Sequence, residues 1–216
     1  MTLSVDVFWS FRSPYSYLAT PRLRSIRDEY DLDLRFRPVR PLAVRDAGFF
    51  ERVHPNWPMY VARDCYRLAQ MAGLPFALPR PDPIVQNMAT REIAAEQPYI
   101  GRLTRLGQAA VEQGDGLAFA DNVARLVWGG TENWHAGDHL AQAAAAAGLD
   151  WAALAAAERD DADWLDAAIV VNEAAQSASG HWGVPLMVFD GEPFFGQDRL
   201  DVLLWRLGQH GLTRRE

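Results

Sequence analysis

The two ends of this chain carry strand patterns and the middle carries helical ones, and this order restricts the fold more than any other feature. Residues 4–9 form an apolar, β-branched run that predicts a buried strand. Ser13-Pro14 then predicts a helix start, with serine as N-cap and proline at the first helical position. Residues 32–36 alternate apolar and charged side chains, which indicates a second strand with one solvated face.

The strand pattern returns only near the end of the chain. Residues 58–179 have helical spacing interrupted by glycine and proline breaks, whereas residues 186–189 and 192–195 are strand candidates. Asp190-Gly191 between them is a typical hairpin turn. Asp198 is predicted to cap a last helix, whose apolar face carries leucines at 200, 203, 204 and 207.

The strand-forming ends must pair with each other to bury their apolar faces. The predicted fold class is therefore α/β: a thioredoxin-like fold with a large all-helical domain inserted between the βαβ and ββα halves. The predicted thioredoxin-like domain is discontinuous and comprises residues 1–42 and 180–216. The inserted helical domain comprises residues 43–179.

Two residue counts exclude whole classes of chemistry. Cys65 is the single cysteine, so an intramolecular disulfide, a cysteine-rich zinc site and a dithiol redox motif are excluded. All 21 basic residues are arginine, which excludes Schiff-base catalysis and a P-loop with its usual lysine. A GC-rich genome alone also produces such a composition. Cys65 shares an apolar helical face with Val61 and Leu68, which predicts an inert core residue.

The charge balance argues against polyanionic partners. The formal net charge of −7 disfavours binding to nucleic acid or to an acidic membrane surface. No apolar run approaches the ~20 residues of a membrane span, and the N-terminus lacks the pattern of a secretory signal, so a cytoplasmic protein is predicted. His135 and His139 have a metal-compatible spacing without an evident third ligand, so no metal site is predicted.

The first candidate site is the tip of the first predicted helix, Ser13 to Ser16. A thioredoxin-like fold places its redox C-x-x-C motif at this junction, and here both cysteine positions are serine. The helix N-terminus still offers free N–H groups and about half a positive charge, which would stabilise a thiolate brought by another molecule. The alternative is that Ser13 is only a helix cap.

The second candidate is Gly183-Val184-Pro185, just before a strand. Thioredoxin-like folds place a cis-proline here, facing the first helix tip, so that the backbone of Val184 could pair with a bound peptide. The alternative is an ordinary trans proline at a strand start.

The third candidate is the junction from Phe194 to Arg199. Gln197 and Asp198 could hold the ammonium and carboxylate of an amino-acid group, and free N–H groups could bind the carboxylate. The alternative is a capped helix without a ligand.

A family resemblance is carried by three segments together: Phe11 to Ala19, Trp182 to Pro185, and Phe195 to Leu200. They resemble the 2-hydroxychromene-2-carboxylate isomerase family, which is related to kappa-class glutathione transferases and, more distantly, to DsbA-like oxidoreductases. The resemblance spans the whole chain, including a run from Tyr60 to Ala69 in the helical insert.

The resemblance implies a glutathione site. Ser13 matches the catalytic serine whose hydroxyl contacts the glutathione sulfur, and Val184 with Pro185 matches the segment that pairs with the cysteinyl part. The loop that comprises Phe195, Gly196, Gln197 and Asp198 matches the family's loop that holds the γ-glutamyl end of glutathione. Gln197 is a mild variation, because relatives often have asparagine or serine there.

The implied activity is isomerisation by reversible addition of glutathione to a conjugated aromatic keto acid, in aromatic compound catabolism. Glutathione is then a cofactor that is not consumed, and a homodimer is what relatives suggest. Two alternatives remain open: a kappa-like glutathione S-transferase that conjugates an electrophile, and a redox-inactive thioredoxin-like binding protein.

One departure from the family concerns the substrate. Many relatives carry a lysine near the loop after the second strand, placed to meet the substrate carboxylate, and this chain has none. Arg45 is the first candidate to replace it, ahead of Arg40 and Arg63, since arginine binds carboxylates in a bidentate manner. Asn56 is a candidate substrate contact in the same region.

Overall fold

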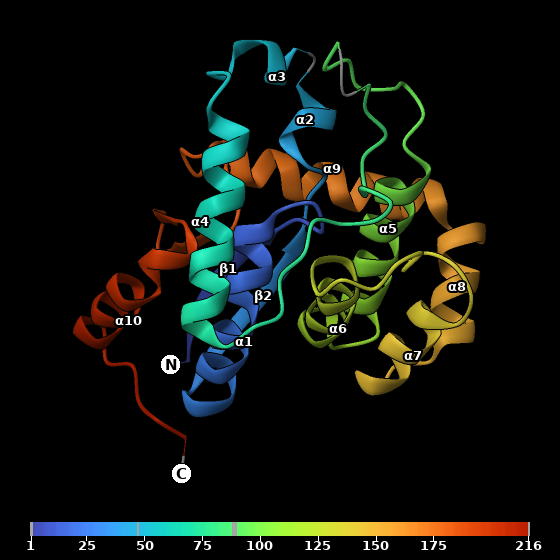
Figure 1. The fold of residues 1–216 in the computed structure, drawn as a ribbon. Coiled ribbons are helices and arrows are strands. Elements are labelled where there is room, and N and C mark those ends of the chain that lie inside the picture. Colours follow the sequence, from blue (N-terminus) through green and yellow to red (C-terminus); the bar gives the residue numbers. More distant parts are fainter. Residues whose placement is uncertain (1, 47, 88–89, 216) are drawn as a thin grey trace.

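Four strands form one mixed sheet in the computed structural model, which describes residues 2–46, 48–87 and 90–215 (Figure 1). The strand order is β2-β1-β3-β4, with bounds β1 (Leu3–Trp9), β2 (Leu32–Pro38), β3 (Leu186–Phe189) and β4 (Glu192–Phe195). β1 runs parallel to β2 and antiparallel to β3, and Val7 pairs with both Phe36 and Met187. The predicted pairing of the two chain ends in a thioredoxin-like sheet is confirmed.

Helices cover both faces of this sheet. α1 (Pro14–Glu29) and α10 (Leu200–Gln209) lie on one face, and α9 (Ala162–Ala178) crosses the other (Figure 1). Phe8 and Leu186 point to the α9 side, where Ala175 packs against them. Val7 and Met187 are fully buried in the larger core on the α1 side. Strand alternation therefore divides the apolar residues of each strand between two helical layers.

α1 begins as its sequence predicts. Ser13 has extended backbone angles, its side chain accepts a hydrogen bond from the Ser16 N–H at 3.1 Å, and Pro14 is the first helical residue. The helix continues through Pro21. This start fixes the point at which the chain leaves β1 and turns back over the sheet.

The helical insert is continuous with the sheet core. Its helices are α2 (Leu42–Arg45), α3 (Phe49–Arg52), α4 (Trp57–Ala72), α5 (Pro98–Glu112), α6 (Gly116–Trp128), α7 (His139–Ala146) and α8 (Trp151–Asp160). Phe11 packs edge-on against both Trp9 and Phe119, and a Cβ on Gly107 would lie 2.8 Å from the Phe11 ring. One buried cluster therefore joins the two predicted units, whose boundaries stay a prediction.

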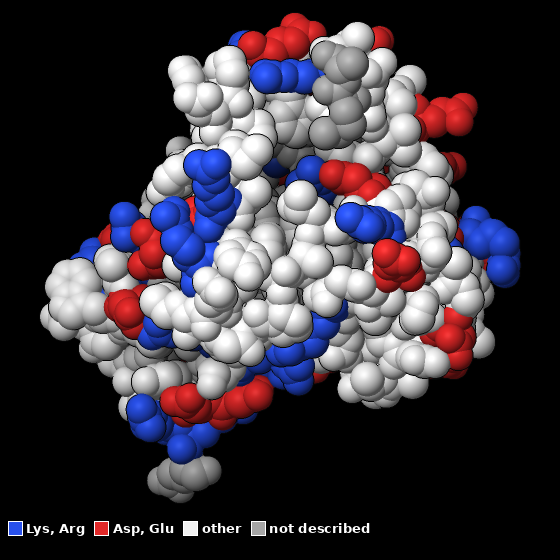
Figure 2. Space-filling model, in the orientation of Figure 1, with Lys and Arg blue, Asp and Glu red and all other residues white. Residues whose placement is uncertain are grey.

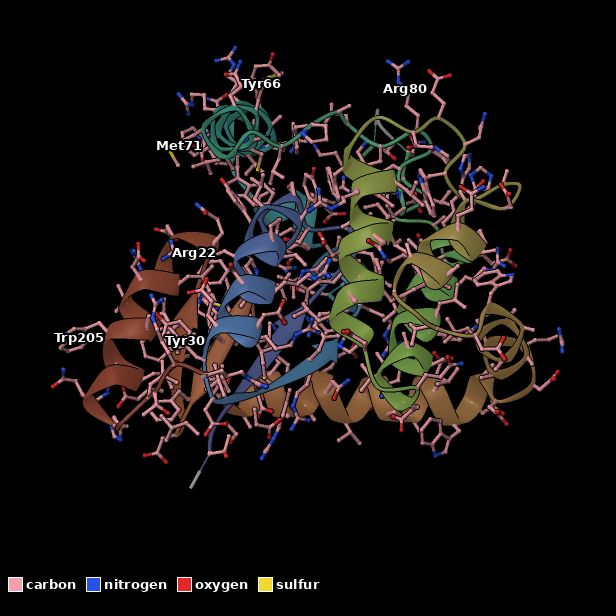
Figure 3. The ribbon with its side chains drawn as sticks, turned by 90° about the horizontal axis from the view of Figure 1, so that it is seen from below. Arg22, Tyr30, Tyr66, Met71, Arg80 and Trp205 are labelled. Carbon is pink, nitrogen blue, oxygen red and sulfur yellow. The ribbon has the colours of Figure 1, made fainter. Side chains whose placement is uncertain are left out.

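α4 is amphipathic and lies across α1. Cys65 and Ala69 lie on its buried face, whereas Tyr66 and Met71 point away from the rest of the molecule (Figure 3). The Tyr15 hydroxyl on α1 donates a 2.9 Å hydrogen bond to Asp64 on α4. The insert is thereby tied to the first turn of α1.

The last helix begins later than predicted. Asp198 lies inside a short 3₁₀ turn, η1 (Gln197–Arg199), and α10 starts at Leu200. The turn forms because Gly196 has a positive φ of 108° and its carbonyl accepts the Arg199 N–H at 3.1 Å. Asp198 caps no helix and is instead 3.0 Å from Arg199 in an ion pair. The predicted N-cap role of Asp198 is wrong.

Over the described ranges, no single helix is long and apolar enough to cross a membrane. The bent pair α7–α8 passes that test by length and composition only.

Candidate functional site

Ser13 and Val184 meet where the two halves of the thioredoxin-like sheet come together. The Ser13 hydroxyl donates a hydrogen bond to the Val184 carbonyl at 3.3 Å. Both residues are half-buried. The first two candidate motifs therefore form one site, at the end of β1 and the start of β3.

The tip of α1 offers one free backbone donor. Pro14 has no N–H, the Ser16 N–H is capped by Ser13, and the Tyr17 N–H bonds to the Ser13 carbonyl. The Tyr15 N–H has no hydrogen-bond partner among the described residues. It lies beside the Ser13 hydroxyl at the positive end of the helix, which favours an anion there.

The Val184–Pro185 peptide bond is cis, as predicted. Pro185 is buried, and the Val184 N–H has no partner in the part of the chain that the structure describes. Val184 therefore presents a free N–H and a carbonyl that holds only the Ser13 hydroxyl. An extended peptide needs this donor–acceptor pair to bind as an additional strand.

The backbone before Val184 is held by a buried glutamine. The amide nitrogen of Gln176 on α9 donates to the Gly183 carbonyl at 2.8 Å and to the Trp182 carbonyl at 3.2 Å. Gln176 is fully buried. Sequence reasoning missed this residue, because a glutamine in a long helical run carries no local signal for such a contact.

Aromatic rings form one wall of the site. The His181 ring stacks on Phe195 with centroids 4.0 Å apart, and on Trp182 at 5.2 Å. A Cβ on Gly183 would lie 2.3 Å from the Phe195 ring, so glycine is required for this close approach. Phe195, predicted at the third motif, is thus joined to the second motif by stacking.

The third motif is connected to the cis-proline, with one correction. The Gly196 N–H donates to the Pro185 carbonyl at 3.0 Å, so it is not one of the free donors expected in this loop. The N–H groups of Gln197 and Asp198 have no partner within residues 2–46, 48–87 and 90–215. These two donors, at the start of a 3₁₀ turn, remain to bind a carboxylate.

Arg45 lies against the loop that contains Trp182 and precedes the cis-proline. One terminal guanidinium nitrogen is 3.5 Å from the Trp182 carbonyl, and its Nε is buried without a hydrogen-bond partner. Burial lowers the pKa of Arg45, and no carboxylate among the described residues is within ion-pair distance of it. A half-buried guanidinium that has no salt-bridge partner among the described residues, and that feels Glu173 only at longer range, favours an anionic ligand.

The other residues considered for the substrate contact differ from Arg45. Arg40 makes a bidentate pair with Glu173 at 2.7 and 2.9 Å. Arg63 lines an open groove between α4 and residues 76–78. Asn56 is exposed at the start of α4, and within the described residues no hydrogen bond joins it to Ser13 or Val184, so its role stays a prediction.

The only cysteine takes no part in this site. Cys65 is fully buried, and burial together with the charge of Asp64 raises the pKa of its thiol to about 12. Burial and the hydrogen bond to Asp64 also raise the pKa of Tyr15. Both groups are therefore protonated at neutral pH, so Cys65 does not act as a thiolate nucleophile.

The face of the molecule drawn in Figure 2 carries side chains of both charges. Basic side chains gather over α4, which carries the exposed Arg63 and Arg67, while acidic side chains cluster over the top of the molecule (Figure 2). In the described residues, no three His, Cys, Asp or Glu side chains lie close enough to hold a metal ion.

Comparison with known proteins assigns the class first. The model of the DSBA-like thioredoxin domain matches residues 4–208, and the chain belongs to this family.

Individual relatives are more specific. A protein from Sphingobium xenophagum named 2-hydroxychromene-2-carboxylate isomerase is 27% identical over 208 residues, which cover 94% of this chain and 97% of that protein. A Pseudomonas putida protein of the same name is 32% identical over 79 residues, covering 35% and 39% of the two chains. The resemblance inferred from the motifs is confirmed.

A solved structure of 2-hydroxychromene-2-carboxylate isomerase matches this fold with a TM-score of 0.69. The match has 24% identity and covers 96% of this chain and 95% of that one. At this identity the likeness shows the fold, and it agrees with the thioredoxin-like architecture of the sheet.

Proposed function

We propose that this protein is a glutathione-dependent isomerase that resembles 2-hydroxychromene-2-carboxylate isomerase and acts on a conjugated aromatic keto acid. The observation that carries the proposal is the hydrogen bond from Ser13 to the Val184 carbonyl. It places a helix N-terminus beside the cis-proline segment. The names of the two curated relatives support the same kind of reaction.

The donors present fit glutathione. The free Tyr15 N–H and the Ser13 hydroxyl suit a thiolate, the free Val184 N–H suits a peptide carbonyl, and the N–H groups of Gln197 and Asp198 suit the γ-glutamyl carboxylate. Bound glutathione would supply the thiolate nucleophile that Cys65 cannot provide. The remaining tasks of the protein are to lower the thiol pKa and to orient the substrate.

Ser13 can support a thiolate only when its hydrogen is released from Val184. A serine hydroxyl has one hydrogen, and here it points to the Val184 carbonyl. A thiolate is a charged acceptor and holds a hydroxyl hydrogen more strongly than a neutral carbonyl does, so a sulfur atom beside Ser13 would turn this hydrogen away from Val184.

Arg45 supplies the contact for the carboxylate of the substrate. Its unpaired Nε and its terminal nitrogen near Trp182 form a donor fork at the edge of the site. This assignment gives arginine the place of the lysine that many relatives carry. The side chain of Trp182, the residue whose carbonyl Arg45 contacts, is exposed and can stack with an aromatic substrate.

The test is turnover of a hydroxychromene carboxylate, followed by absorbance with and without reduced glutathione. We expect turnover that depends on glutathione while the total glutathione concentration stays constant. Stoichiometric loss of glutathione would instead indicate a transferase. No turnover at any glutathione concentration contradicts the proposal.

Calorimetric titration and thermal unfolding separate an enzyme from a binding protein of another kind. Glutathione at 100 times its Kd should stabilise the native state by about 2.7 kcal/mol. If glutathione neither binds nor raises the melting temperature, the chain is a redox-inactive domain with another ligand.

A further inference from the structure

His181 connects two segments of the site through a single ring. Its Nδ1 accepts the Gly183 N–H at 3.0 Å, a contact from a side chain to the backbone two residues on. The same ring stacks on Phe195 with an interplanar angle of 23°. The residue immediately after Gly183 is Val184, and the residue after Phe195 is Gly196.

The contact with Gly183 sets the protonation state of the ring. An Nδ1 that accepts a hydrogen bond carries no hydrogen, so the ring is neutral with its hydrogen on Nε2. Protonation at Nδ1 would place a second hydrogen against the Gly183 N–H. Two donors would then face each other, and the hydrogen bond would be lost.

The consequence reaches the ligand-binding backbone. Gln176 holds the Gly183 carbonyl at 2.8 Å, so with the His181 contact both polar groups of this peptide segment are fixed. The next N–H along the chain is the free donor of Val184. Loss of the His181 acceptor leaves this segment anchored from one side only.

We propose that His181 is a positioning residue for the glutathione site, and that only its neutral form holds Val184 in the orientation that binds the peptide backbone. The inference rests on the proposed function, because glutathione is the ligand it concerns. It adds a residue that no motif in the sequence indicated, and it makes ligand binding sensitive to acid.

The groups around His181 define the direction of this pH dependence. Phe195 and Trp182 face the ring, Gln176 on α9 is uncharged, and Arg45 on α2 reaches the loop only through the Trp182 carbonyl. On η1, Asp198 is paired with Arg199. Burial lowers the pKa of His181, so the ring becomes half-protonated only at a pH below the ordinary histidine pKa of about 6.5.

The test is the affinity for reduced glutathione, measured by calorimetry between pH 5 and 7.5. We expect the affinity of the unmodified protein to fall toward low pH, by up to about tenfold per unit below the pKa. His181→Asn keeps an acceptor two residues before the same N–H, as in an Asx turn, and should bind with little change over this range. His181→Phe keeps a ring without an acceptor and should bind weakly at every pH.

His210 provides the matched control. It packs edge-on against Phe189 at the other end of β3, and His210→Asn should keep the pH dependence of the unmodified protein. An unchanged pH dependence in His181→Asn would overturn the inference. If the unmodified protein binds no glutathione at any pH, the proposed function fails instead.

A second readout needs no ligand. Histidine ¹⁵N spectra at pH 7.5 should show the Nε2–H tautomer for His181, assigned by its absence in His181→Asn. An Nδ1–H tautomer contradicts the inference even if glutathione binds.

Discussion

The side-chain hydroxyl of Ser13 donates to the backbone carbonyl of Val184 at 3.3 Å, across a separation of 171 residues. The same oxygen accepts the Ser16 N–H at 3.1 Å. Ser13 is therefore both a helix cap and a bridge to the cis-proline segment. A change at this position affects local stability and the site by separate routes, which can be measured separately.

Ser13→Ala should affect activity far more than folding. Loss of the cap costs ~1 kcal/mol of unfolding free energy. Loss of a donor to a developing or bound anion typically lowers catalytic efficiency by about 100-fold or more. We expect kcat/KM to fall on this scale while denaturant unfolding changes little.

Ser25→Ala is the control for this substitution. Ser25 is exposed on the same helix, and in the described part of the chain its hydroxyl bonds only to Glu29, so its removal should leave both stability and activity unchanged. Equal activity of Ser13→Ala and Ser25→Ala would remove Ser13 from the mechanism.

Arg45 and Arg40 should respond in opposite ways to replacement by glutamine. Arg45→Gln removes an unpaired guanidinium, so we expect a raised KM for the substrate with little loss of stability. Arg40→Gln leaves Glu173 without its bidentate partner, which should cost about 1.5–3 kcal/mol without a change in KM. Kinetics and chemical unfolding of both variants check the pair; a raised KM only in Arg40→Gln would reverse the assignment.

Gly183→Ala should displace the aromatic wall. The new methyl group would lie 2.3 Å from the Phe195 ring, and overpacking of this kind typically costs about 1–3 kcal/mol. Phe195→Ala removes the two nearest obstructing atoms and leaves the His181 ring at 3.0 Å, so the double variant should be more stable than the sum of the single effects predicts. Strict additivity in unfolding free energies would show that the two residues do not clash.

Cys65 should resist thiol reagents in the native protein. With a pKa raised to about 12 by burial and by the charge of Asp64, only about one thiol in ten thousand is ionised at pH 8. We expect negligible labelling by iodoacetamide until denaturant unfolds the chain. Rapid labelling of the folded protein would mean that Cys65 is accessible and reactive.

Much of the fold could be predicted because it depends on local signals. Alternation at residues 32–36, the Ser13-Pro14 helix start and the Asp190-Gly191 turn each act within a few residues. The order of these signals then leaves few ways to bury the apolar faces. Asp198 shows the limit of such signals. A tight turn after Gly196 includes Asp198, so the last helix starts at Leu200 and Asp198 does not cap it.

Part of the site escaped prediction for a related reason. Gln176 and His181 act on backbone groups of the loop that contains Gly183, and neither residue type has a distinctive pattern there. The sequence ranks Arg45 ahead of Arg40 by its position, but it does not show which of the two has an ion-pair partner. Only the position of Glu173 on a distant helix pairs one of them and leaves the other free.

The sequence by itself determined that the chain folds as a thioredoxin-like sheet with a helical insert, and that it brings no reactive thiol of its own. Both follow from local periodicity and from the presence of a single cysteine in an apolar pattern. The tertiary structure decided which donors stay free, because hydrogen bonds between distant segments consume some of them. The Gly196 N–H is bonded to the Pro185 carbonyl, whereas the Val184 N–H has no hydrogen-bond partner among the residues that the structure describes.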